Sequence, residues 1–316
     1  MVRNITITTI VALILLLSCS MEKRKGNVKT DLIDMGLQGK VKSLIEVSYK
    51  AEDKFGELQK GPIIDKTIYY FNEKGNFNEY MVYESDGALT KKETMIYDTN
   101  GNIVEYNQFY RNILESKETY QYDNEGNKTE ISYFDKNGIL NGKIINKFDN
   151  NGNEIKSTHY NSEGSLERIY ESIFDKKGNK IQEILNEPEG TLKRKTISRF
   201  DEQGNEIETS YFYPNGNLDC KYIRNFDSNG NIIEINWYNS YGALIGNVIY
   251  KYDEKGNEIE CTDSELSYGI KHIYIYDYKK ADIEGNWILQ VNKYFRLSNT
   301  EREANLTIIE RKLEYF

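Results

Sequence analysis

Residues 148–153 read Phe-Asp-Asn-Asn-Gly-Asn, and this six-residue phrase decides the fold. Related phrases recur along the chain, each with an aromatic residue, usually Asp, two polar residues and Gly-Asn. Their glycines are Gly75, Gly101, Gly126, Gly152, Gly178, Gly204, Gly230 and Gly256. Neighbouring members of this series lie 26 residues apart, with one interval of 25, and a ninth phrase ends at Gly285. We call these phrases the major turns.

A looser series of glycines lies between them, 12 residues after one major glycine and 14 before the next. These minor turns contain Gly87, Gly138, Gly164, Gly190, Gly216 and Gly242. One copy is degraded, because Asn112 and the two residues after it stand where glycine is expected. Each unit therefore holds two turns and two strands of about 7–9 residues, a normal strand length.

The chemistry of the major turns favours β-hairpins. Asp at the first position of a type I turn accepts hydrogen bonds from backbone N–H groups two residues on, and Gly at the fourth position adopts φ > 0 without a Cβ penalty. A type I turn followed by a left-handed glycine is a common hairpin connection. The residues predicted to hold these turns are Asp98, Gly101, Asp149, Gly152, Asp175, Gly178, Asp201, Gly204, Asp227, Gly230, Asp253 and Gly256.

Two turns per unit predict antiparallel pairing of consecutive strands, with major turns along one edge and minor turns along the other. We count about twenty strands, including Val41–Tyr49, Trp287–Phe295 and Leu306–Tyr315. Both strand faces carry apolar and charged residues, which does not indicate one dense core. We therefore predict an all-β fold, an elongated twisted antiparallel meander of tandem 26-residue β-hairpin repeats. Both an open sheet and one that curls closed are compatible with this pattern.

The first residues look like an export signal. Arg3 is the only charge before an apolar run of 13 residues from Ile5 to Leu17, too short to span a bilayer. The run ends in Leu-Leu-Ser-Cys at residues 16–19, which resembles the lipobox of bacterial lipoproteins. That resemblance implies cleavage before Cys19 and attachment of acyl chains such as palmitate to it. An ordinary secretory signal with an incidental cysteine is the alternative.

These features divide the chain into three parts. Residues 1–18 are predicted to be a lipoprotein signal peptide, and residues 19–40 a lipidated cysteine with a polar tether. Residues 41–316 are predicted to form a single β-repeat domain, with repeats over about 70–286 and C-terminal capping strands over 287–316.

The aromatic-Asp-x-x-Gly-Asn phrase resembles the YD repeat of Rhs-like proteins, over about Tyr70 to Asn286. The ending, with Trp287 after Gly-Asn and then Leu313-Glu314-Tyr315, is similar to the closing segment of short envelope YD-repeat proteins. The resemblance implies β-hairpin repeats and a surface or secreted location. Large relatives wrap such repeats into a shell around a C-terminal toxin, and we expect a short form without a toxin domain here.

Composition excludes several kinds of site. Lys+Arg is 41 and Asp+Glu is 50, so the net charge of -9 disfavours nucleic-acid binding. Two histidines and three cysteines exclude a histidine-rich metal centre and a multi-disulfide scaffold. Cys220 and Cys261 lie three strands apart in the predicted meander, or about 14 Å. That separation is too great for a disulfide, so both are predicted to be free, partly buried thiols.

No catalytic constellation stands out. Carboxylate pairs such as Glu206/Glu208 and Glu258/Glu260 could serve glycoside hydrolysis, but they recur with the repeat, which favours a solvated stripe. Asp149 begins a pattern that resembles a calcium loop, yet the region of the bidentate Glu reads Thr-His-Tyr, and turn stabilisation explains the same residues. We predict no catalytic residues, no metal site and no cofactor.

Aromatic residues offer the best candidate binding surface. The cluster at neighbouring minor turns comprises Tyr211, Tyr213, Trp237, Tyr238 and Tyr241. Structurally, such residues form cross-strand ladders in a sheet. Functionally, rigid amphipathic rings beside Asn and Gly suit glycans or protein loops.

Together these features predict a membrane-anchored lipoprotein of the bacterial cell envelope, periplasmic or surface-facing, acting as a non-enzymatic interaction scaffold for a protein or glycan partner. We expect a monomer that binds the membrane through its lipid and binds no nucleic acid. One alternative is an immunity-type protein that neutralises a toxin. Another is a glycan-active enzyme, which would show a carboxylate with a strongly raised pKa in a cleft.

Overall fold

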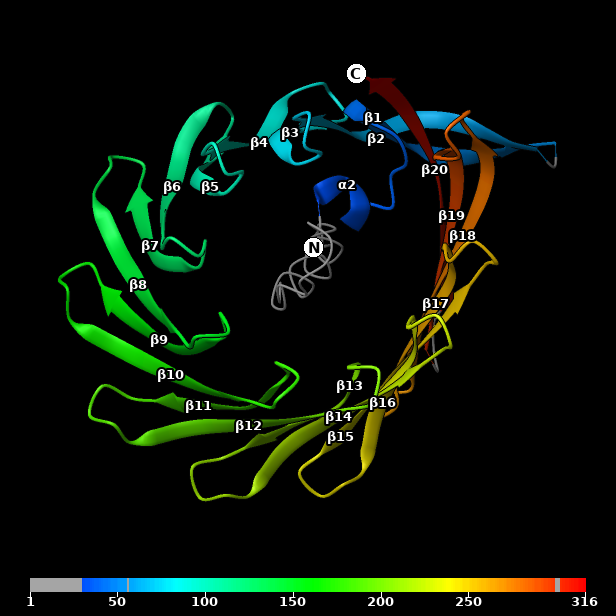
Figure 1. The fold of residues 1–316 in the computed structure, drawn as a ribbon. Helices are drawn as coiled ribbons and strands as arrows, with labels where there is room; N and C mark the ends of the chain where they lie inside the picture. Colours follow the sequence, from blue (N-terminus) through cyan, green and yellow to red (C-terminus); the bar gives the residue numbers. More distant parts are fainter. Residues whose placement is uncertain (1–29, 56, 299–301) are drawn as a thin grey trace, which may run out of the picture.

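A computed structural model describes residues 30–55, 57–298 and 302–316, which form one short helix and twenty strands (Figure 1). The elements in chain order are α2 (Asp31–Asp34), β1 (Val41–Lys54), β2 (Glu57–Phe71), β3 (Phe77–Glu84), β4 (Leu89–Tyr97), β5 (Ile103–Tyr110), β6 (Ile113–Tyr122), β7 (Lys128–Asp135), β8 (Leu140–Phe148), β9 (Glu154–Asn161), β10 (Leu166–Phe174), β11 (Lys180–Asn186), β12 (Leu192–Phe200), β13 (Glu206–Phe212), β14 (Leu218–Phe226), β15 (Ile232–Asn239), β16 (Leu244–Tyr252), β17 (Glu258–Glu265), β18 (Ile270–Ala281), β19 (Trp287–Leu297) and β20 (Arg302–Tyr315). No helix in these ranges is both long enough and apolar enough to cross a bilayer.

The major turns are held by their own side chains. Asp149 Oδ1 accepts hydrogen bonds from the backbone N–H groups of Asn151 at 2.8 Å and Asn153 at 2.9 Å, and Oδ2 accepts one from the Asn153 amide at 2.9 Å. Hydrogen bonds from Asn153 hold the pKa of Asp149 below its ordinary value. Gly152 has φ 82°, which glycine adopts without strain. In six other major turns, the Asn after the glycine donates hydrogen bonds from its backbone N–H and its side-chain amide to the carboxylate of the first residue. These first residues are Asp98, Asp123, Asp175, Asp201, Asp227 and Asp253.

The minor turn without glycine adopts a different turn type. Arg111 and Asn112 have φ of 49° and 65°, so both central residues are left-handed, as a two-residue type I′ hairpin requires. The strands on either side keep their antiparallel pairing, from Tyr110 opposite Ile113 onward.

The strands close into a barrel. Each strand pairs antiparallel with the next in the chain, and β1 also pairs with β20, from Val41 opposite Tyr315 to Lys50 opposite Thr307. The prediction of an all-β antiparallel fold with about twenty strands is confirmed. The strands form a closed barrel in place of the predicted elongated twisted meander. The ring is on the order of 40 Å across its backbone, for strands about 4.8 Å apart with ordinary tilt.

Two physical effects account for closure. Register shifts occur beside the major turns, for example between Lys147 and Phe148 and between Arg199 and Phe200. Such bulges add twist and bend to each hairpin, and small contributions accumulate over a wide sheet. Closure then removes both exposed edges, which would otherwise present unpaired N–H and C=O groups.

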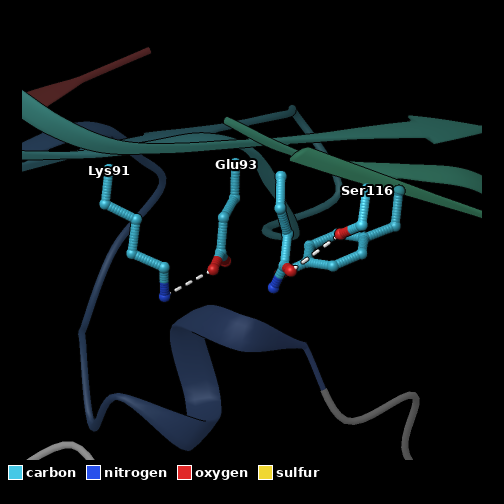
Figure 2. A network of polar contacts seen from close by, with 5 residues as sticks. Lys91, Glu93 and Ser116 are labelled. Atoms are coloured by element: carbon cyan, nitrogen blue, oxygen red, sulfur yellow. Dashed lines mark hydrogen bonds and ion pairs between the residues drawn. The ribbon is translucent and has the colours of Figure 1, made fainter. Parts of the chain in front are cut away.

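The register identifies the inner and outer faces of the barrel. Figure 2 shows the side chains of Lys91, Glu93 and Ser116 extending from the sheet toward α2, which lies inside the ring in Figure 1. Residues directly opposite each other on paired strands share a face, so the register of the strands carries this assignment around the barrel. The tyrosines on the inner face include Tyr69, Tyr80, Tyr106, Tyr120, Tyr133, Tyr170, Tyr211, Tyr222, Tyr250, Tyr274, Tyr276 and Tyr294.

The outer face mixes charged and apolar side chains. Cross-strand ion pairs on this face join Lys92 to Glu79, Lys117 to Glu105, Lys143 to Glu130, Lys156 to Glu171, Arg199 to Glu208 and Lys251 to Glu260. Each exposed pair contributes little stability on its own. Exposed isoleucines, including Ile96, Ile173 and Ile249, lie between these pairs on the same face.

Residues 31–40, here called the clasp, tie the ends of the barrel together. The Leu32 N–H donates to the carbonyl of Gly75 at 3.1 Å, in the β2–β3 turn. The Gln38 N–H donates to Asn286 Oδ1 at 2.7 Å, and the Asn286 amide donates back to the Gln38 carbonyl at 2.9 Å, in the β18–β19 turn. The clasp therefore bridges major turns on both sides of the β1–β20 junction. This part of the predicted tether, residues 19–40, is packed rather than free.

Five of the buried apolar side chains gather at the same junction. The cluster comprises Leu32, Leu37, Val41, Leu44 and Phe71, and Val41 and Leu44 are fully buried. Most of the inner wall elsewhere is half-buried. The hydrophobic core is thus a local seam between the clasp and strands β1, β2 and β20.

Candidate functional site

One row of side chains on the inner wall follows the minor turns around the barrel. Its directly opposed pairs are Val82–Lys91, Gln108–Ser116, Tyr133–Gly142, His159–Arg168, Leu185–Arg194, Tyr211–Cys220, Trp237–Gly246 and Asp263–His272. We call this the minor-turn row. Its residue types change from strand to strand, whereas the turn residues stay nearly constant, so this row is where the barrel is chemically distinctive.

Aromatic rings become continuous along strands β12 to β15. Tyr211 and Tyr222 meet edge to face with ring centres 6.0 Å apart, and Tyr222 and Trp237 lie 6.4 Å apart. The Arg194 guanidinium lies 5.5 Å from the centre of the Tyr211 ring, at cation–π distance. We call Arg194, Tyr211, Tyr222 and Trp237 the aromatic arc.

Trp237 packs against the backbone of the neighbouring strand. A Cβ atom at Gly246 would be 2.5 Å from Trp237 Nε1 and 2.6 Å from Cε2, so any side chain there would displace the indole. The indole therefore covers Gly246, and the side chain is half-buried on the inner wall of the barrel. Within the described residues, no group accepts a hydrogen bond from the indole N–H.

The charged groups near the arc differ in their pairing. Arg224 donates to Thr209 Oγ1 at 2.7 Å and pairs with Glu206 at 3.2 Å, so its charge is already compensated. Arg194 and Arg168 are exposed, and no carboxylate of the described chain pairs with either. Burial raises the pKa of Tyr211 and of Tyr222, so both keep their hydroxyl protons at neutral pH.

The structure separates the five aromatic residues predicted from the sequence. Tyr211 and Trp237 lie together on the inner wall. Tyr238 lies on the outer face, where Lys221 Nζ is 5.4 Å from its ring centre. Tyr213 and Tyr241 belong to minor turns at the rim, with 48% and 93% of their surfaces exposed.

Sequence reasoning missed Tyr222 and Arg194. A usable signal is present, because Arg168 and Arg194 are 26 residues apart, as are Tyr211 and Trp237. Residues at one position of successive units belong to the same row of the same face. Sorting the aromatic and cationic residues by position within the unit would have grouped Arg168 with Arg194 and Tyr211 with Trp237. It would not have found Tyr222, whose equivalents in the neighbouring units are Thr196 and Val248.

A hollow lies at Gly142, the position that corresponds to Gly246 one hundred and four residues earlier. A pocket of about 250 Å³ opens there, lined by residues that include Tyr133, His159 and Glu167. The rings of His159 and Tyr170 are tilted at 49° with their centres 5.1 Å apart. Glu167 lies on β10, so strand β11 separates this pocket from Arg194 of the aromatic arc on β12.

The carboxylate pairs have different surroundings. Glu208 and Glu260 form outer-face ion pairs, as a solvated stripe would. Glu258 lies opposite Tyr252 and is half-buried, and burial raises its pKa to about 7. An enzyme was expected to show a carboxylate that has a strongly raised pKa and lies in a cleft. Glu258 has the raised pKa, but it does not line the pocket at Gly142 or the pocket of about 210 Å³ beside the clasp.

Other predicted features are settled in part. Cys220 and Cys261 are free thiols, as predicted; Cys220 is half-buried, whereas Cys261 is buried rather than partly buried. Cys19 lies outside the described residues. Within residues 30–55, 57–298 and 302–316, no group of three or more His, Cys, Asp or Glu side chains could hold a metal ion. The oxygens of Asp149 are occupied by its own turn.

Comparison with known proteins finds distant structural neighbours. No protein-family model and no curated protein matches the chain. A porin-like protein from Bacteroides uniformis has 8% sequence identity and a TM-score of 0.37, over 87% of this chain and 98% of that one. The Photorhabdus luminescens Tc holotoxin pore has 11% identity and a TM-score of 0.41, over 82% of this chain. The chain spans only 15% of the toxin chain and 16% of the TcdB2-TccC3-TEV chain, which has 13% identity and a TM-score of 0.31.

Proposed function

We propose that this chain is a lipid-anchored YD-repeat protein of the bacterial envelope whose closed barrel binds a partner on its inner wall without transforming it. The observation that carries the binding role is the aromatic arc with its unpaired donors. Trp237, Tyr211 and Tyr222 present half-buried rings, and Arg194 presents an unpaired cation. Rigid rings with adjacent donors make effective recognition surfaces because little conformational entropy is lost on binding.

The anchor is supported by the lipobox-like residues 16–19 and by the position of the clasp. Thr30, the residue before the clasp, lies only eleven residues after Cys19, and the clasp is fixed to the major turns that contain Gly75 and Asn286. Eleven residues span at most about 36–40 Å. Because the clasp is attached to the major turns, this proposal places their rim nearer the membrane and the rim with Tyr213 and Tyr241 facing away.

Lipidation is tested by metabolic labelling with a palmitate analogue. The wild-type protein and the Cys220→Ser control should incorporate label and sediment with membranes, whereas Cys19→Ala should do neither. Label in Cys19→Ala, or none in wild type, would show that the anchor is wrong.

The binding role is tested with purified protein and acrylamide, a neutral quencher of tryptophan emission. In a Trp287→Phe background, Trp237 is the remaining one of the two tryptophans. Quenching of Trp237 by acrylamide would show that small solutes reach the inner wall. Emission that acrylamide leaves unchanged would contradict the proposal.

A glycan-active enzyme remains a second candidate because of Glu258. Its half-buried carboxyl is surrounded by Tyr250, Tyr252 and Tyr276 on the inner wall, and a carboxyl with pKa about 7 can act as a general acid near neutral pH. The test is turnover of an oligosaccharide that binds the barrel. Cleavage abolished by Glu258→Gln would favour the enzyme over the scaffold.

A further inference from the structure

We propose that the aromatic arc, together with Arg168, is a binding site for an acidic oligosaccharide, one that carries carboxylate groups on its sugar rings. This inference rests on the proposed function, because it requires the inner wall to be open to ligands. The site would run along the minor-turn row from β10, which holds Arg168, to β15, which holds Trp237. Five strand spacings make this path about 24 Å long, enough for several sugar rings in line.

Trp237 provides the stacking surface. Its indole is held by contact with the bare backbone at Gly246, as the 2.5 Å and 2.6 Å distances from a notional Cβ show. A ring fixed in this way offers its remaining surface without losing rotamer freedom on binding. The apolar face of a sugar ring packs on such a surface, and the indole N–H, which has no acceptor among the described residues, can donate to a sugar hydroxyl.

Tyr222 and Tyr211 extend this surface toward β12. Their ring centres follow Trp237 at 6.4 Å and a further 6.0 Å. Within the described chain, neither hydroxyl has a hydrogen-bond partner. Each tyrosine hydroxyl can donate a hydrogen bond to a ligand hydroxyl or accept one from it. A purely apolar ligand would leave these hydroxyls without a hydrogen bond.

The two arginines select the charge of the ligand. Arg194 is oriented by its stacking on Tyr211, at 5.5 Å, and both Arg194 and Arg168 are exposed and unpaired in the described structure. A planar guanidinium binds a carboxylate through two parallel hydrogen bonds. Arg168 and Arg194 lie on strands two apart, or about 10 Å, so one chain with a carboxylate on each ring can reach both.

Neighbouring acidic groups mark the limits of the site. Glu183 on β11 pairs with Lys180, so it does not compensate Arg194. Asp263 and Glu265 face inward on β17 beside His272, and they make the wall beyond β16 unfavourable for an anion. Stacking rings with free arginines would also suit single-stranded nucleic acid. An acidic glycan has a lower charge density than nucleic acid, so a protein with a net charge of -9 repels the glycan less.

The test uses purified Trp287→Phe protein titrated with hexagalacturonate and followed by Trp237 emission. Maltohexaose serves as a neutral ligand of the same length, and a six-nucleotide oligo(dT) as the nucleic-acid comparator. Calorimetry then compares Trp237→Ala, Arg168→Gln with Arg194→Gln combined, and the outer-face control Tyr238→Ala. Thermal unfolding of each variant confirms that it is folded.

Hexagalacturonate should change Trp237 emission, whereas maltohexaose should bind at least about tenfold more weakly. Trp237→Ala and the double arginine variant should each lose about tenfold or more in affinity, with Tyr238→Ala unchanged. Equal binding of maltohexaose would refute the choice of an acidic ligand, and tighter binding of oligo(dT) would assign the site to nucleic acid. If acrylamide quenches Trp237 but hexagalacturonate does not bind, this inference fails and the proposed function stands. If acrylamide does not quench Trp237, both fail.

Discussion

Replacement of Leu44 by alanine tests the seam that closes the barrel. Leu44 is fully buried on β1, between β2 and β20, and it packs in the cluster formed by Leu32, Leu37, Val41 and Phe71. Leu→Ala changes in well-packed cores cost about 2–5 kcal/mol, and the cost rises when the site cannot collapse. Strands pair with β1 on both sides, which restricts collapse, so we expect the free energy of unfolding to fall by about 3–5 kcal/mol.

The assay is equilibrium unfolding in urea, with Ile45→Ala as the matched control. Ile45 is the next residue on β1, faces outward and is half-buried, so its truncation should cost clearly less. Hydrogen exchange should also speed up in Leu44→Ala at β20, whose Leu313 and Tyr315 pack against the cluster. A loss below about 1 kcal/mol, or one equal to that of Ile45→Ala, would refute the seam as the principal core of the barrel.

Three further predictions concern single residues. Glu258 has a folded-state pKa of about 7, above its ordinary value of 4.5, so the stability it contributes is present below pH 4.5 and is lost as pH rises toward and through 7. Glu258→Gln should therefore remove part of the fall in melting temperature between pH 5 and pH 8, whereas Glu260→Gln on the outer face should not; identical pH profiles for wild type and Glu258→Gln would contradict this. Gly152→Ala places a Cβ at φ 82° and should cost about 1–2 kcal/mol in urea unfolding, and a neutral result would show that the turn relaxes. Gly246→Ala should displace the indole of Trp237 and red-shift its emission in the Trp287→Phe background, because the new Cβ would lie 2.5 Å from Nε1; an unchanged spectrum would mean that the ring does not lie on Gly246.

The local structure was predictable because short-range chemistry decides it. Asp149 and Gly152 specify their turn through bonds that reach no further than four residues, and the even spacing of such turns predicts antiparallel hairpins. Closure was not predictable in the same way. It depends on the summed twist of twenty strands and on pairing between Val41 and Tyr315, far apart in the chain and outside the turn phrases.

The candidate site was predictable in part for a related reason. Trp237 and Tyr238 are adjacent, so alternation of side chains along a strand places them on opposite faces. The sequence analysis grouped the two residues because they are adjacent in the chain, but in the structure they lie on opposite faces of the sheet. Arg194 joins Tyr211 only across the β12–β13 pair, and that contact requires the strand register, which the bulge between Arg199 and Phe200 shifts.

Closure of the barrel is tested most directly by a disulfide between β1 and β20. Val47 and Glu310 are directly opposite in the structure, which places their Cα atoms about 4.5–5.5 Å apart. In a Cys220→Ser, Cys261→Ala background, Val47→Cys with Glu310→Cys should form an intramolecular disulfide under mild oxidation, detected as one linked peptide by mass spectrometry. Val47→Cys with Ile184→Cys, which lies on β11, should not. An open sheet would hold β1 and β20 about 90 Å apart, so a Val47–Glu310 pair that fails to link, or links only between molecules, would contradict the closed barrel.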